Sequence, residues 1–521
     1  MKKWIAAAVL AASVMNAGAA QAQGREPSLY LRCDGEPNNM TGGEQFARFL
    51  GAITLLGIFA PSPESPDPDA RLFGGGGVDA CTQLIDGEDG EGNPVRRVPL
   101  ILARALHYVE MRNYEAALAD VARARAEAAA ADLIGNPYFD RSMGLSFNNI
   151  EAAVHLRMGN PERARDVSLS SIADMRYSFV PGLYANDFGR FLKDMSPEAE
   201  IRNHVAGQIM PQFLLTYAGR LDEVGRFDDS AKVYEAFITV VDSLGDGPRA
   251  SAPYARAAIA HALGGNWEAA TEWADRARSN MNHRIAEGQP EDNSSSIVEL
   301  LDLFTVLQQA NDGDVKAARR MYSARSQWTV PSFGSVLEVN RLLSRGAQPD
   351  ELIGALSQTA DELWQQRYDE LMAIELQDDT ENDDLFDLIV DYAKVDEFED
   401  RARNTHRVER SRMITDEPDE DGHYAITATG SIQSAIDSIV LHAALQAQHR
   451  GKQGFTMLLT TPQPGYGGPI TIAFVQFVDP GEDNAHDILF IPAADVIAEL
   501  GEVIPTRDEV RARERERRRN R

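Results

Sequence analysis

The chain has 521 residues, and 80 acidic against 51 basic residues give it a formal net charge of -29. Hydrophobic residues make up 43% of the chain, which is enough to build cores, so the composition excludes an intrinsically disordered protein. So acidic a surface repels nucleic acid and anionic lipid, and it suits either solubility or a basic partner. We therefore expect no nucleic-acid partner.

The first 22 residues have the order of a secretory signal peptide. Two lysines precede an apolar run over residues 4–14, and a small-residue Ala-Gln-Ala pattern ends at Ala22. We therefore expect an exported, periplasmic protein that is cleaved between Ala22 and Gln23. A signal anchor is the alternative, but the run is shorter than the roughly 20 residues of a helical span. We expect no membrane span.

The segment 23–97 looks irregular and holds the chain's two cysteines, Cys33 and Cys81. Prolines over residues 61–68 exclude a helix there, and the four-glycine run 74–77 predicts a loop. In an oxidising compartment an even cysteine pair predicts a disulfide. A metal site or a catalytic thiol would need nearby histidines, and the sequence has none between residues 23 and 106.

From about residue 98, apolar residues recur at helical spacing in pairs of stripes. In the first pair, the two stripes lie on either side of Asn113, which predicts two antiparallel helices joined by a short turn. Similar pairs flank Gly159, Gly225 and Gly265, and a partial pair flanks Gly313. In most copies a small residue allows the two helices to approach closely, and Gly or Asn permits the turn.

These hairpins resemble the tetratricopeptide repeat (TPR) family of helical-repeat proteins, in a degenerate form, over residues 98–330. The first and fourth copies carry the small and aromatic residues at the family's positions: Ala105, Tyr108, Tyr114, Ala117 and Ala124, then Ala258, Gly265, Trp267, Ala270 and Ala277. The strict 34-residue period is absent, and an extra segment lies over residues 177–209. A generic helical bundle is the alternative.

In the TPR family, the first helices of stacked hairpins line a concave surface that holds extended peptides or helices. The resemblance therefore implies a groove for a protein or peptide, lined by Leu102, Leu106, Val109, Asn149, Ala153, Leu156, Gln212 and Leu215. Asn149 is the candidate to hydrogen-bond a peptide backbone. The alternative for the apolar members is core packing between helices.

The pattern changes after an acidic segment at residues 416–422, which predicts a linker. An amphipathic helix is expected over 431–448, strands over 457–459, 470–478 and 488–491, and a short helix over 493–500. The fold class is thus mainly α, with a TPR-like α-α hairpin superhelix over residues 98–412. A small C-terminal α+β domain follows over 423–505, and a charged Arg/Glu-rich tail over 506–521.

The chain has no G-x-S-x-G, H-E-x-x-H or P-loop motif. His155 and His261 take the place of Tyr108, which favours packing, whereas His442 and His449 lie seven residues apart on one helix face. We expect an exported interaction or scaffold protein, in envelope assembly, with no enzymatic activity, cofactor or metal. The alternatives are a small-molecule or metal binder, and an enzyme with its site in the C-terminal domain.

Overall fold

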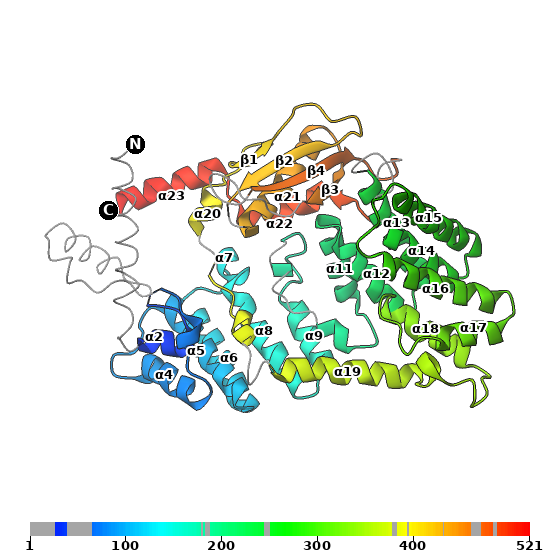
Figure 1. The fold of residues 1–521 in the computed structure, drawn as a ribbon. Helices are drawn as coiled ribbons and strands as arrows, with labels where there is room; N and C mark the ends of the chain where they lie inside the picture. Colours follow the sequence, from blue (N-terminus) through cyan, green and yellow to red (C-terminus); the bar gives the residue numbers. More distant parts are fainter. Residues whose placement is uncertain are drawn as a thin grey trace, which may run out of the picture. The chain divides into compact units, whose positions relative to one another are not determined.

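The computed structural model describes residues 27–38, 65–178, 181–182, 188–243, 251–377, 383–392, 395–430, 432–459, 470–482 and 487–520. The expected signal peptide and its cleavage site lie outside these residues. The chain forms two compact units: a first unit of residues 1–159 and 374–392, and a second unit of residues 160–373 and 393–521. It is mainly helical, with one small antiparallel sheet, as the sequence predicts (Figure 1).

The first unit is helical throughout its described residues. Its elements are α2 (Leu29–Asp34), η2 (Pro68–Ala70), α4 (Gly75–Asp86), α5 (Pro94–Glu110), α6 (Tyr114–Ala130), α7 (Pro137–Asp140), α8 (Met143–Arg157) and η5 (Asp383–Leu388). A disulfide joins Cys33 of α2 to Cys81 of α4, with both residues fully buried. This confirms the predicted pairing. The loop expected over residues 74–77 is wrong, because Gly75 to Gly77 form the first turn of α4.

Close packing explains why that helix begins with glycines. A Cβ atom added to Gly77 would lie 2.3 Å from the imidazole ring of His107 on α5. His107 is fully buried, and its ring nitrogens lie 2.7 Å from the Cys33 carbonyl oxygen and 2.7 Å from the Glu110 carboxylate. Gly77 therefore allows α4 to approach α5 at a histidine whose polar atoms are both satisfied.

The second unit begins at Asn160, so along the chain its first helix is α9. Its helical elements are α9 (Pro161–Ser170), η3 (Phe188–Phe191), α11 (Pro197–Ile209), α12 (Phe213–Glu223), α13 (Phe227–Asp242), α14 (Ser251–Leu263), α15 (Trp267–Ala286), α16 (Ser294–Asn311), α17 (Val315–Ser323), α18 (Phe333–Ser344), η4 (Gly354–Leu356), α20 (Val395–Glu399), α21 (Ile432–His449), α22 (Ala493–Val503) and α23 (Arg507–Arg519). Helix α19 (Ala360–Gln377) crosses the boundary between the units.

Every expected hairpin turn has the same backbone conformation at one position. The residue before the second helix's N-cap is left-handed in all five copies, at Arg112, Gly159, Gly225, Gly265 and Gly313, with φ between 56° and 90°. Glycine adopts this conformation without the steric cost of a side chain, and four of the five are glycine. The close-contact residues are also in place: Ala258 of α14 and Ala270 of α15 are both fully buried.

The sheet lies entirely in the second unit. Its strands are β1 (Ser411–Met413), β2 (Tyr424–Thr429), β3 (Gly454–Leu459), β4 (Ile470–Val478) and β5 (Ile491–Pro492), in the order β1-β2-β4-β3-β5, with all neighbours antiparallel. Helices α21 and α22 lie together on one side of the sheet (Figure 1). Residues 434–447 of α21 are all buried, so this helix is the core of the domain.

The sheet contains two strands that the sequence did not predict, β1 and β2, and β2 is paired on both sides. The predicted linker at residues 416–422 lies inside the sheet's connection from β1 to β2, so the α+β fold already includes residues 411–413. The strand expected over 488–491 is confined to β5 at residues 491–492. The charged tail forms α23, which begins with a reciprocal capping box between Thr506 and Glu509.

Candidate binding cleft

The eight residues expected to line a peptide groove differ in exposure. Six of them are at most 2% exposed: Leu102, Leu106 and Val109 on α5, and Asn149, Ala153 and Leu156 on α8. Gln212 is exposed and Leu215 is half-buried, at the start of α12. The six buried residues form core, which was the alternative interpretation, and they offer no surface to a ligand in this structure. Neither amide atom of Asn149 has a hydrogen-bond partner among the described residues.

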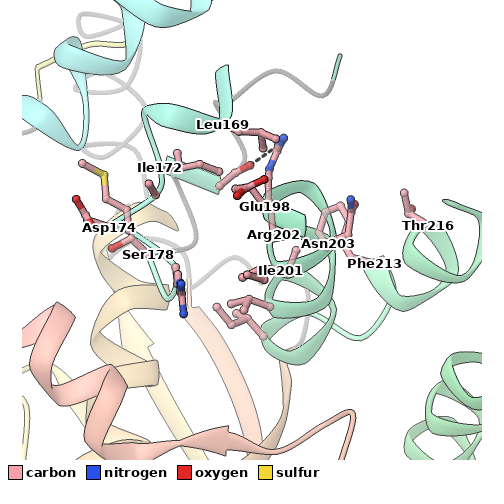
Figure 2. A pocket seen from close by; sticks show the side chains of 17 residues that line it. Leu169, Ile172, Asp174, Ser178, Glu198, Ile201, Arg202, Asn203, Phe213 and Thr216 are labelled. Atoms are coloured by element: carbon pink, nitrogen blue, oxygen red, sulfur yellow. Dashed lines mark hydrogen bonds between the residues drawn. The ribbon is translucent and has the colours of Figure 1, made fainter. Parts of the chain in front are cut away.

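A cleft of about 550 Å³ lies instead within the second unit, between the end of α9, the turn after it, α11 and the start of α12 (Figure 2). Its apolar lining residues are Leu169, Ile172, Ala173, Met175, Ile201, Val205, Ala206, Ile209 and Phe213. Its polar lining residues are Asp174, Arg176, Ser178, Glu198, Arg202, Asn203 and Thr216, with Gly182 at one edge. The volume is within the usual range of ligand pockets, roughly 300–1,000 Å³.

Helix α11 provides one wall of the cleft from a single face. Glu198, Ile201, Val205 and Ile209 recur at spacings of three or four residues, so they lie along one side of the helix. The helix begins at Pro197, and the Ser196 hydroxyl caps it by accepting from the Ala199 amide at 3.2 Å. Ile201 is 40% exposed, so an apolar side chain on this wall meets solvent.

The other side of α11 is held by its neighbours. A Cβ atom added to Gly207 would lie 2.5 Å from Leu214, so the glycine lets α11 approach α12 closely. Towards the sheet domain, His204 Nε2 lies 2.7 Å from the Ile488 carbonyl oxygen, and Gln208 donates to the Phe490 carbonyl at 2.7 Å. These contacts fix α11 with its apolar face towards the cleft.

The opposite wall is the turn over residues 171–178, and a single carboxylate holds it. Glu499 on α22 accepts from the amides of Tyr177 and Ser178 at 3.0 and 3.1 Å, and from the Ser178 hydroxyl at 3.1 Å. Burial and the negative charges of Asp495 and Glu499 raise the pKa of Tyr177 to about 12. The phenol therefore stays neutral, and the turn is held to the C-terminal domain by hydrogen bonds to one charge.

Figure 2 shows Ile172 extending from this turn towards α11, which carries Ile201 and Arg202. At the edge of the cleft, Arg202 donates a hydrogen bond to the Gly182 carbonyl at 2.7 Å (Figure 2). The guanidinium thus joins α11 to the chain that leaves the turn. The cleft lining is mainly apolar, with charged and polar side chains among the apolar ones.

The 17 lining residues include two carboxylates, Asp174 and Glu198, and no histidine, cysteine or lysine. Of the two hydroxyl side chains, Ser178 donates to the Glu499 carboxylate and has no imidazole as a base. The arrangement suits binding of an apolar group, with polar contacts at the opening to orient it.

The sequence did not predict this cleft, although it indicated an extra segment that contains some of the lining residues. Residues 177–209 were expected only as an extra segment between hairpins, and α11 forms the last 13 of them. The apolar spacing of Ile201, Val205 and Ile209 was the available signal. Among the described helices, none has the length and apolar character that crossing a bilayer requires.

No protein family, no curated protein and no solved structure matches this chain.

Proposed function

We propose that this chain is an exported, non-catalytic interaction protein that binds an apolar segment of a partner polypeptide in the cleft between α9, α11 and α12. The observation that carries the proposal is the exposed Ile201 on α11, which belongs to a cleft lining whose other apolar residues are mostly buried or half-buried and include Ile172 and Phe213. Exposed apolar side chains at a cleft are typical of surfaces that bind other molecules.

Two further features support the proposal. The five expected hairpin turns, each with a left-handed residue, support membership of the TPR family, whose helical surfaces bind peptides. The Cys33–Cys81 disulfide supports export, because disulfides persist in oxidising compartments such as the periplasm. We propose that the role is in envelope assembly, and the net charge of -29 suits a basic partner as well as solubility.

Site-specific photo-crosslinking in cells that express the chain tests the proposal. A photoreactive amino acid replaces Ile201 in the cleft and, as a matched control, Ile285 on α15. Both are exposed isoleucines on helices of the same unit, at 40% and 52% exposure. We expect one or a few polypeptides to be captured at position 201 and not at position 285. The same products at both positions, or none at 201, would contradict the proposal.

A small apolar molecule is the second candidate, and the cleft volume of about 550 Å³ favours it. Native mass spectrometry of the purified chain separates the two. A bound small molecule that is lost in the variant Ile201→Glu but kept in Ile285→Glu, together with no capture at position 201, would establish the small-molecule function in place of the polypeptide one.

A further inference from the structure

A second cavity, of about 510 Å³, lies in the C-terminal α+β domain and differs in kind from the apolar cleft. It is lined by His406, Arg407, Ser411, Arg412, Met413, Asp416, His442, Gln446, His449 and Arg450. Three arginines and three histidines face one acidic residue. We propose that this cavity binds a small anion that carries a phosphate group, such as a phosphomonoester or inorganic phosphate.

One helix face supplies a wall of the cavity. His442, Gln446 and His449 recur at spacings of four and three residues at the end of α21, and Arg450 directly follows the helix. The pair of histidines seven residues apart, which the sequence analysis noted, is therefore part of a larger set. Strand β1 and the residues before and after it provide the remaining wall, including Arg407 and Arg412.

The inner end of the cavity is fixed by hydrogen bonds. His442 is 2% exposed, and its Nδ1 lies 2.8 Å from the Ser411 hydroxyl. Gln446 donates to the His406 carbonyl at 2.8 Å, which holds the chain beside the helix. The ring of His406 stacks on that of His449, with 4.3 Å between the ring centroids. These contacts pre-organise the polar groups before any ligand arrives.

The arginines of this cavity are available for an anion. None of Arg407, Arg412 and Arg450 forms an ion pair with a carboxylate among the residues that the structure describes. Arg450 instead lies over the rings of Tyr424 and Phe477, at 4.6 and 5.1 Å from their centroids, which positions its guanidinium. By contrast, the neighbouring Arg410 pairs with Asp400 at 2.9 Å.

The charge of the lining selects the kind of ligand. With the histidines neutral, three arginines against Asp416 leave two positive charges, which a phosphate dianion neutralises. The rest of the chain has a large negative charge, so a long polyanion such as nucleic acid is repelled and a small anion is favoured. The described residues contain one group with the geometry of a metal site, Asp419 with Asp421 and His423, and it does not involve the cavity histidines.

Isothermal titration calorimetry of the full mature chain tests the proposal. The probes are inorganic phosphate, glycerol 3-phosphate, and vesicles of phosphatidylcholine with and without phosphatidic acid. The variants Arg407→Gln and Arg412→Gln each remove one exposed guanidinium, and Arg410→Gln is the matched control from the same stretch of chain. We expect wild type and Arg410→Gln to bind at least one phosphate probe. Each cavity variant should bind that probe at least about tenfold more weakly.

The pattern of probes identifies the source of the phosphate group. Binding of either soluble probe supports a soluble ligand, and binding only to vesicles with phosphatidic acid supports a lipid headgroup. Circular dichroism confirms that the variants are folded. No binding of any probe by the wild type, or equal loss in Arg410→Gln and the cavity variants, would overturn the proposal.

Discussion

The hydrogen bonds of Glu499 predict that one carboxylate controls the turn that forms a wall of the apolar cleft. Replacing Glu499 with Gln removes the charge and places an NH₂ group against backbone N–H donors of Tyr177 and Ser178. A hydrogen bond to a charged group contributes about 1.5–3 kcal/mol, and bonds that share one acceptor group do not add independently. We expect local opening of the turn to become easier by about 3 kcal/mol, or roughly 100-fold in its equilibrium constant.

Amide hydrogen exchange measures this change directly, because the exchange of Tyr177 and Ser178 depends on how often the turn opens. We expect their exchange to accelerate by roughly two orders of magnitude in Glu499→Gln. Glu502→Gln is the matched control, because Glu502 is an exposed carboxylate on the same helix. Unchanged exchange at both amides in Glu499→Gln would show that the turn is held by other contacts, and the reasoning would be refuted.

Three further predictions concern stability. Reducing the Cys33–Cys81 disulfide, which closes a loop over 48 positions, is expected to destabilise the chain by about 4 kcal/mol, and thermal unfolding with and without reductant measures this. Gly334→Ala is expected to lower the unfolding free energy by about 1–3 kcal/mol, because the added Cβ would lie 2.2 Å from the backbone of Asp222. The control Gly219→Ala, whose Cβ would have nothing within 4 Å, should not destabilise the chain. Equal denaturant midpoints for the two variants would contradict this. Burial raises the pKa of Asp222 from 3.8 to about 6, so the contribution of Asp222 to the stability of the folded chain should fall as pH rises from 4 to 6. Asp222→Asn should lack this loss, so its stability relative to wild type should rise by up to about 3 kcal/mol between pH 4 and pH 7. The same difference in unfolding free energy between the two proteins at both pH values, measured by urea unfolding, would exclude this.

Local signals explain which parts of the fold were predictable. The hairpin turns were found because each needs a left-handed residue, and a glycine or asparagine at the turn is visible in the chain. Helix α21 was found because its apolar residues recur over five turns. In contrast, β1 is three residues long and lies among arginines, so it has no pattern of its own, and only its pairing with β2 makes it a strand.

The binding sites were less predictable because distant segments build them. The apolar cleft joins residues 169–182 to residues 198–216, and its turn is held by Glu499, more than 300 positions away. The second cavity, in the C-terminal α+β domain, is built from residues 406–416 and residues 442–450. The sequence therefore revealed only the two histidines that share a face of α21. Spacing within one helix reveals a shared face, but no local pattern reports what another segment places against that face.

The burial of α5 shows why the expected groove is not found in the first unit. A first helix lines a groove only if one of its faces stays uncovered, and α5 is covered by α2 and α4 as well as by α6 and α8. The cover is specific: the Arg96 guanidinium of α5 pairs with Asp34 at the end of α2, and Arg104 of α5 pairs with Asp86 of α4 at 2.9 Å. Because the disulfide holds α2 to α4, these two helices together cover the face of α5 that carries Arg96, Arg104 and His107. The apolar residues that resembled a groove lie elsewhere around α5 and are buried in the core of the first unit. We therefore expect binding in the second unit, where Ile201 on the cleft wall of α11 is 40% exposed.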